Sequence, residues 1–170
     1  LSILRDVFLF TFAIEAIGTA LMFFRFFPGT NVVEALYISV FHSISSFCNA
    51  GFSLFSQSFV PYQGDWFLNI VMCFLIVSGG IGFLVFSELK QQFPLNRRSW
   101  SRLSLHSKLV LSTTAILLLF SSFLIIAMEW HNTLAPLSIL DRFLAGFFQS
   151  VTARTAGFNT LSIGNMANET

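Results

Sequence analysis

The sequence predicts an all-α polytopic membrane protein, in which long helices and short re-entrant helices follow one another in a repeated order. Three observations lead to this prediction: an apolar composition, three runs long enough to span a bilayer, and an internal repeat. Of the 170 residues, 55% are hydrophobic and 10% are charged, and the mean hydropathy is +0.76. A soluble domain of this size could not bury so much apolar surface, so the chain is expected in a membrane.

Charge, cysteine and histidine content narrow the classes of function. The formal net charge of +1 gives no indication of nucleic acid or another acidic partner. Cys48 and Cys73 lie in apolar runs and are expected to be small buried hydrophobes, because they form neither a disulfide framework nor a metal-ligand spacing. His42, His106 and His131 share no ligand spacing with one another or with an acid, so no resident metal site is expected.

Three apolar runs can each cross a bilayer as a helix. They cover residues 3–27, 66–89 and 105–130. Each slightly exceeds the ~20 residues that a hydrocarbon core requires at a rise of about 1.5 Å per residue. The chain begins without Met and runs at once into the first apolar stretch, so we expect it to be part of a larger protein rather than to carry a signal peptide.

Two shorter runs have a helical pattern but are too short and too polar to cross. They cover residues 32–48 and 140–155. Each run opens with a capping-box pair, which is Asn31 with Glu34 in the first and Ser138 with Asp141 in the second. The side chains of such a pair can satisfy the first amides of a helix. We therefore expect both runs to dip into the membrane and return to the same side.

The linker between the second and third spans indicates the orientation. Residues 90–108 contain no acid and five of the nine basic residues, which are Lys90, Arg97, Arg98, Arg102 and Lys108. Because basic residues concentrate in cytoplasmic loops, this linker is predicted to be cytoplasmic. The first and third spans then run outwards across the plasma membrane, and both dips open to the outside.

A repeated word marks the end of each dip. "NAGF" and "TAGF" place a glycine between Ala and Phe at Gly51 and Gly157, which are 106 residues apart. Chance could produce the shared word in so biased a composition, but the same offset carries residues 3–27 onto 109–133 and the first dip onto the second. A span, a dip and a glycine that recur in register indicate an internal repeat. The chain therefore reads as one span–dip–span unit followed by the first two parts of another.

The two glycine segments require a special environment. Backbone that leaves a helix at membrane depth must be buried in protein or line water, because each unpaired amide costs several kcal/mol in hydrocarbon. A short helix that points inwards directs its negative end to the bilayer centre, and carbonyls beyond it can replace the water shell of a cation. Gly51 and Gly157 suit that bend, with Phe52 and Phe158 expected to pack behind it. Residue type alone leaves open that both are ordinary helix-end glycines.

These residues lead to a known family. "FHSISSFCNAGFSLF" and "SVTARTAGFNTLSIGNM" resemble the second and third pore loops of the Trk/Ktr/HKT potassium transporter family, most closely those of the membrane subunit of Ktr systems. The resemblance covers essentially the whole chain. It implies repeated helix–pore loop–helix units with re-entrant pore helices, four of which surround one pore. Residues 1–98 would be the second unit with its basic linker, and residues 99–170 the helix and pore loop of the third.

The resemblance also implies a function, which is potassium uptake across the plasma membrane by a transporter that is not an enzyme. The backbone carbonyls of the two loops would form two of the four walls of a K⁺ filter, namely those of Asn49, Ala50, Gly51, Phe52, Thr155, Ala156, Gly157 and Phe158. K⁺ would be the transported ion, with Na⁺ as the coupling ion expected in the Ktr branch and no covalently bound cofactor. Cys48 departs from the family, in which Asn is frequent at this position.

Several partners follow from the same resemblance. They are the remaining units of the same polypeptide, a second copy in a homodimer, membrane lipid and a cytoplasmic nucleotide-binding regulatory subunit. Arg97, Arg98 and Arg102 of the basic linker are available contacts for that subunit. No nucleic acid is expected.

Three alternatives to potassium uptake differ in how well they fit the sequence. A Na⁺-preferring, HKT-like transporter stays open, because glycine at both visible filter positions is compatible with K⁺ without proving it. A membrane enzyme is disfavoured, because the serines near His42 come without a G-x-S-x-G elbow. A purely structural membrane subunit is disfavoured by the paired dips.

Five further residues are candidates for supporting or lining the pore. Glu15 lies mid-span, where an acid costs about 2.5–3.5 kcal/mol, and it either lines the cavity or is a packing residue. Arg154 directly precedes the second glycine loop and is expected to brace it by pairing with a carboxylate or carbonyls. Gly79, Gly80 and Gly82 in "SGGIG" lack nucleotide-loop spacing and indicate close helix approach or a flexible point in a lining helix.

Overall fold

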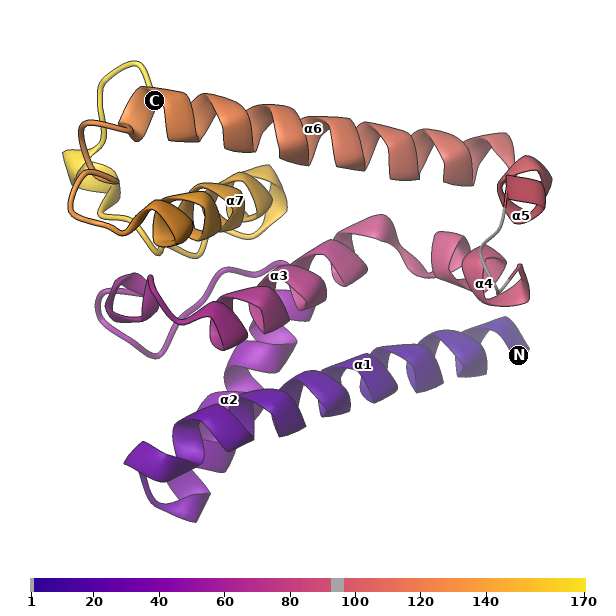
Figure 1. The fold of residues 1–170 in the computed structure, drawn as a ribbon. Coiled ribbons are helices and arrows are strands. Elements are labelled where there is room, and N and C mark those ends of the chain that lie inside the picture. Colours follow the sequence, from indigo (N-terminus) through magenta and orange to yellow (C-terminus); the bar gives the residue numbers. More distant parts are fainter. Residues whose placement is uncertain (1, 93–96) are drawn as a thin grey trace.

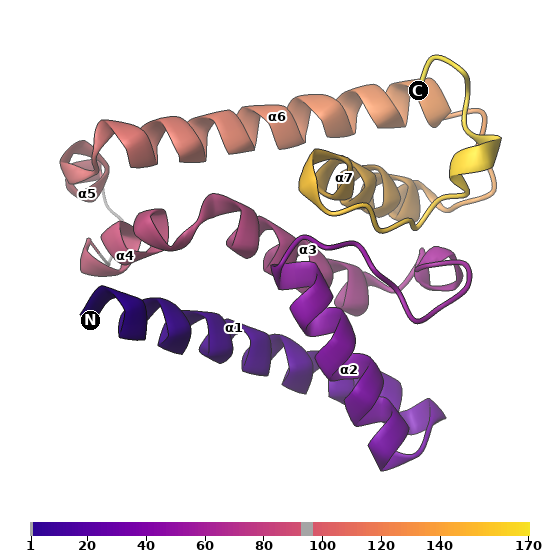
Figure 2. The ribbon, with the colours of Figure 1, turned by 180° about the vertical axis from the view of Figure 1, so that it is seen from behind.

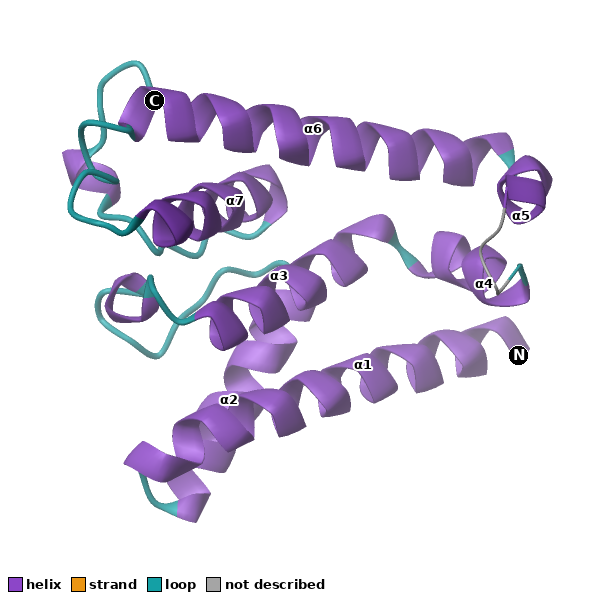
Figure 3. Ribbon diagram, viewed as in Figure 1, coloured by secondary structure: helices purple, strands orange, loops and turns teal. Residues whose placement is uncertain are grey.

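The computed structural model describes residues 2–92 and 97–170, and every regular element within these ranges is helical (Figure 3). The α-helices are α1 Ser2–Phe26, α2 Val32–Phe47, α3 Trp66–Ile81, α4 Phe83–Gln91, α5 Arg97–Arg102, α6 Leu105–Glu129 and α7 Ile139–Thr155. Short 3-10 turns lie at Phe27–Gly29, Val60–Tyr62 and Ile163–Asn165. The predicted all-α class is confirmed. Residues 93–96 of the basic linker lie outside the described ranges, as do the side chains of residues 97–99.

Two helices are long and apolar enough to cross a membrane, and the third predicted span is broken. Helices α1 and α6 have 25 residues each. The run 66–89 was predicted as one helix, but α3 and α4 meet at an angle of 97°. The break lies at Gly82, whose φ of 86° is outside the helical region and costs little only for glycine. This corrects the prediction of a straight span, and it agrees with the flexible point expected in "SGGIG".

Both short helices begin where their caps predict. The Asn31 side chain accepts a hydrogen bond from the Glu34 amide at 2.9 Å, and Ser138 Oγ accepts one from the Asp141 amide at 3.2 Å. Helices α2 and α7 have 16 and 17 residues. At about 1.5 Å per residue, neither reaches the ~30 Å of a hydrocarbon core.

The arrangement of the helices agrees with the predicted topology (Figures 1 and 2). Helices α3 and α7 lie between α1 and α6, and α2 crosses α1 with its start on the side away from α6. The N-terminus, α4 and α5 lie at one end of the molecule, whereas the starts of α2 and α7 lie towards the other. Both short helices therefore start at the end opposite α4 and α5, and the opening of the dips to the outside stays a prediction.

Helix α3 is the centre of the packing. Met72, Leu75 and Ile76 of α3 are almost fully buried in one cluster with Phe148 and Val151 of α7. The same cluster includes residues of α1 and α2. Because α3 contacts both short helices, it fixes the second loop relative to the first.

The same hydrogen bond joins the short helix to the long helix in both halves. The number of residues between equivalent positions of the two halves differs for the long and the short helices. Ser43 Oγ of α2 donates to the Glu15 carbonyl of α1 at 2.7 Å, and Ser150 Oγ of α7 donates to the Leu118 carbonyl of α6 at 2.8 Å. These contacts relate the long helices by 103 residues and the short helices by 107 residues. A single offset of 106 is therefore wrong for the long helices, because the connection from α6 to α7 is longer than that from α1 to α2.

Candidate functional site

The loops that follow α2 and α7 contact each other directly. Thr155 Oγ1 donates to Asn49 Oδ1 at 2.7 Å, and these residues are 106 positions apart. Next to this bond, Gly51 lies so close to the second loop that a Cβ on it would overlap the Ala156 carbonyl oxygen and lie 3.3 Å from the Gly157 Cα. The offset found in the sequence thus joins two residues that meet in space.

The backbone of both loops enters the left-handed region. The φ angles are 54° at Asn49, 72° at Gly51 and 94° at Gly157. Asn49 comes directly after the last turn of α2, where Asn is among the few side chains that tolerate this conformation. Gly157 comes directly after the cap of α7 and is a helix-end glycine, whereas Gly51 is two residues further along its loop. Gly157 therefore lies at a helix end and Gly51 does not, and a role of either glycine in a filter stays a prediction.

Beyond the glycines, the two loop segments remain hydrogen-bonded to each other. The Phe59 amide donates to the Asn159 carbonyl at 2.8 Å, and the Asn159 amide donates to Ser58 Oγ at 3.1 Å. Phe158 is fully buried, with its ring 5.5 Å from that of Phe59. Phe52 is 71% exposed, so the expected packing behind the loops holds for Phe158 and not for Phe52.

Buried polar side chains of helix α2 form hydrogen bonds with the loop that follows this helix. Ser45 Oγ donates to the Phe52 carbonyl at 2.8 Å. His42 Nε2 lies 3.3 Å from the Leu54 amide nitrogen and 3.3 Å from Ser53 Oγ. No sequence signal indicates this role, because a serine-rich helical face and a histidine without ligand spacing are typical of ordinary packing.

The three glycines of "SGGIG" have three different environments. A Cβ on Gly79 would overlap the carbonyl oxygen of Phe47 at the end of α2. A Cβ on Gly80 would meet the Arg154 guanidinium at an ordinary 3.8 Å, and Gly82 faces open space. Gly79 is therefore the point of close helix approach, and Gly82 is the point of bending.

Arg154 lies beside α3, and of the two kinds of partner expected for it, a carboxylate is absent among the described residues. Its guanidinium is about 3.8 Å from the position of a Cβ on Gly80. In the part of the chain that the structure describes, no carboxylate lies within 4.0 Å of its side-chain nitrogens. The expected pairing with a carboxylate is thus not formed here, because the acids of this chain lie elsewhere.

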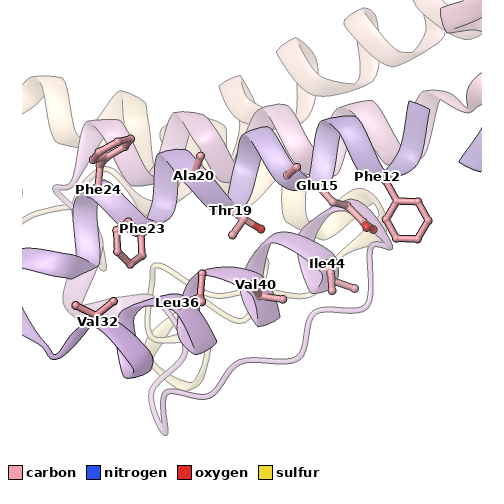
Figure 4. Close-up of a pocket in the computed structure, with 11 residues that line it drawn as sticks. Phe12, Glu15, Thr19, Ala20, Phe23, Phe24, Val32, Leu36, Val40 and Ile44 are labelled. Carbon is pink, nitrogen blue, oxygen red and sulfur yellow. The ribbon is translucent and has the colours of Figure 1, made fainter. Parts of the chain in front are cut away.

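Glu15 lines an apolar groove between α1 and α2 (Figure 4). The groove has a volume of about 610 Å³, and its walls include Phe12, Leu36 and Val40. The Glu15 carboxylate extends from α1 towards the C-terminal end of α2, and its Oε1 is 4.0 Å from the thiol of Cys48. Glu15 is therefore close to the first loop without belonging to it.

A buried acid that the sequence analysis missed fixes the end of the second loop. Glu129 closes α6 and is fully buried. It accepts hydrogen bonds from Thr133 Oγ1 at 2.7 Å, from the Ala167 amide at 2.9 Å and from Thr170 Oγ1 at 2.6 Å. The carboxylate thereby ties the segment after the second loop to the end of the long helix. An acid that ends an apolar span was the available signal.

The two loops offer main-chain carbonyl oxygens, rather than a cluster of side chains, as ligands for any bound cation. Within the described ranges, no group of three His, Cys, Asp or Glu side chains could hold a metal ion. The carbonyls of the two loops are uncharged ligands of the kind that suits a monovalent cation. Helices α2 and α7 also direct their C-terminal ends to the same region, which adds negative potential there.

Comparison with known proteins gives consistent relatives. Ktr system potassium uptake protein B of Bacillus subtilis is 38% identical over 168 residues, which is 98% of this chain and 37% of that protein. The protein of the same name from Vibrio alginolyticus is 34% identical, over 95% of this chain and 35% of its own length. Potassium/sodium uptake protein NtpJ of Enterococcus hirae is 35% identical, over 93% of this chain and 34% of its own length. The chain spans about a third of the length of these relatives.

A family model described as a cation transport protein, TrkH, matches residues 2–170. The match extends over both long helices, the broken pair and both glycine loops, and the relatives named above are uptake proteins rather than enzymes. The chain therefore belongs to the TrkH family of cation transport proteins and is a multi-pass membrane protein.

Proposed function

We propose that this chain supplies two of the four walls of a K⁺ filter in the membrane subunit of a Ktr/Trk-type uptake system of the plasma membrane. Residues 1–98 are the second helix–pore loop–helix unit in this proposal, and residues 99–170 are the first half of the third. The observation that carries it is the direct contact of the two loops at Asn49 and Thr155 and at Gly51 and Ala156. Direct contact of the two loops supports their being adjacent walls of one pore.

The proposed ligands are the carbonyls of the eight loop residues Asn49, Ala50, Gly51, Phe52, Thr155, Ala156, Gly157 and Phe158. A dehydrated cation needs several oxygens at fixed positions, and main-chain oxygens are fixed best where the backbone itself is held. The Ser45 bond to the Phe52 carbonyl and the two loop-to-loop bonds beyond the glycines hold this backbone.

The choice of ion rests on the relatives. Two of them are named potassium uptake proteins and a third is named a potassium/sodium uptake protein. K⁺ is therefore the proposed transported ion, and Na⁺ is proposed as the coupling ion. A Na⁺-preferring, HKT-like cation transporter is the second candidate function, and the name potassium/sodium uptake protein of the third relative favours it.

The test uses the full-length polypeptide in cells that lack K⁺ uptake. We expect growth at low K⁺ and Rb⁺ uptake that K⁺ outcompetes at concentrations at which Na⁺ does not. Removal of external Na⁺ is expected to slow uptake. Na⁺ uptake that exceeds Rb⁺ uptake would favour the second candidate, and uptake of neither ion would contradict the proposal.

We also propose that the basic linker contacts a cytoplasmic regulatory subunit, and that the full transporter is a homodimer. The support is the charge of Arg97, Arg98 and Arg102 in the linker, together with the exposure of Arg102. Replacing all three by Gln in the full-length protein is expected to reduce co-purification of that subunit at least severalfold, with Lys90→Gln as the control. Undiminished co-purification of the triple variant would exclude this contact.

A further inference from the structure

His42 is a fully buried polar side chain near the first loop. It lies on α2. Its ring stacks on Phe55 with centroids 4.9 Å apart, and it meets Phe59 edge-on at 4.9 Å and Phe41 edge-on at 5.5 Å. An imidazole held among phenyl rings has little freedom to rotate, so the direction of its two nitrogens is fixed.

Both nitrogens face backbone groups whose roles are unambiguous. Nδ1 lies 2.9 Å from the Ile38 carbonyl oxygen, and Nε2 lies 3.3 Å from the Leu54 amide nitrogen. A carbonyl can only accept a hydrogen bond and an amide can only donate one. The proton is therefore on Nδ1, and Nε2 accepts from Leu54 and from the Ser53 hydroxyl at 3.3 Å.

This geometry connects a rigid helix to the loop segment that follows Gly51. Ser53 Oγ also accepts from the Phe55 amide at 3.1 Å, so one imidazole nitrogen fixes three consecutive residues of the loop. Ser45, one turn further along α2, fixes the Phe52 carbonyl at 2.8 Å. The backbone on the far side of Gly51 is thus held at two successive points by one helix.

We propose that neutral His42 is a positioning residue, which holds residues 52–55 so that the carbonyls of the first loop keep the spacing required for ion selection. The inference rests on the proposed function, and it adds to it a residue outside the filter that determines selectivity. His42 does not touch the ion; it acts through the amide of Leu54.

The corresponding position of α7 suggests the conservative replacement. The offset of 107 residues that relates the two caps places Gln149 at the position of His42. Gln149 is buried and its Oε1 has no hydrogen-bond partner within the described residues, so α7 shows only that glutamine fits this side of a short helix in size. The amide oxygen of Gln at position 42 reaches about as far as Nε2, whereas Asn is one methylene shorter and Leu cannot accept a hydrogen bond.

The experiment compares His42→Leu, His42→Asn and His42→Gln in the full-length protein at matched membrane abundance. Leu and Asn are expected to lower the ratio of Rb⁺ to Na⁺ uptake about tenfold, because a buried amide is left without a partner. His42→Gln is expected to keep the Rb⁺/Na⁺ uptake ratio within about twofold of the wild type, because its amide oxygen can still accept the hydrogen bond. Ser39→Ala is the matched control, since Ser39 is equally buried on α2 but bonds only to the Ala35 carbonyl of its own helix.

A second readout does not depend on transport. Hydrogen exchange of the purified full-length protein is expected to be about tenfold faster for the Leu54 and Phe55 amides in His42→Leu, and unchanged in His42→Gln. If the wild type transports neither ion, the proposed function fails and the exchange measurement still decides whether His42 holds the loop. If no His42 variant accumulates, Ser53→Ala in the loop takes their place in both measurements.

Two results would overturn the inference. One is a His42→Leu protein, or in its absence a Ser53→Ala protein, whose selectivity and amide exchange equal those of the wild type. The other is an equal loss of selectivity in His42→Gln and His42→Leu, because the bond to Leu54 would then not be the reason for the effect.

Discussion

We expect the Gly79→Ala protein to fail to fold, while Gly80→Ala accumulates normally. The two glycines are neighbours in α3, but a Cβ on Gly79 overlaps the carbonyl oxygen of Phe47, and one on Gly80 makes an ordinary contact with Arg154. Backbone cannot yield as a flexible side chain does, so Gly79→Ala is expected to cost at least ~3 kcal/mol. Gly80→Ala removes a glycine from a helix and is expected to gain up to about 1 kcal/mol.

The measurement is the yield of monodisperse full-length protein in detergent and its midpoint of thermal unfolding. The adjacent pair controls for helix propensity, membrane depth and expression. Equal yields and midpoints for the two variants would show that α3 does not pack against the end of α2 as described.

The second expected result separates the glycines of the two loops. Gly51→Ala should prevent assembly of the site, because its Cβ overlaps the Ala156 carbonyl and its φ is 72°. Gly157→Ala should still fold, since its surroundings are open and only the strain at a φ of 94° remains. That strain costs roughly 1–2 kcal/mol. The folded Gly157→Ala protein is then the informative variant for transport.

Membrane abundance and Rb⁺ and Na⁺ uptake are measured for both variants of the full-length protein. We expect little folded Gly51→Ala protein, and Gly157→Ala protein at near wild-type abundance with a changed Rb⁺/Na⁺ ratio. Gly29→Ala, at a position without close neighbours, is the control. If Gly157→Ala leaves the ratio unchanged, residues 155–158 do not line the filter.

The parts of the fold that the sequence predicted are those decided locally. The long helices follow from apolar length, and the starts of α2 and α7 follow from Asn31 and Ser138, whose caps act within one turn. The word "AGF" located both loops because positive φ restricts the residue type. Each of these signals lies within a few residues of its effect.

The parts that it did not predict depend on residues distant in the chain. Nothing local distinguishes Gly79 from Gly80, because the difference is made by Phe47 of another helix. Gly18 of α1 gave no signal for the same reason, although a Cβ there would lie 2.6 Å from Ser43 Oγ of α2. His42 was passed over because its partners, the Leu54 amide and the surrounding phenyl rings, are assembled only by the fold.

The contact between Gly51 and Ala156 has a consequence for how freely this region can vary. The contact there is between backbone atoms of the two loops. The distance between the loops is therefore set by the main chain rather than by side chains. One of the side chains around the contact is that of the exposed Phe52. Mutations can therefore change the side chains around this contact while the distance between the two loops stays the same.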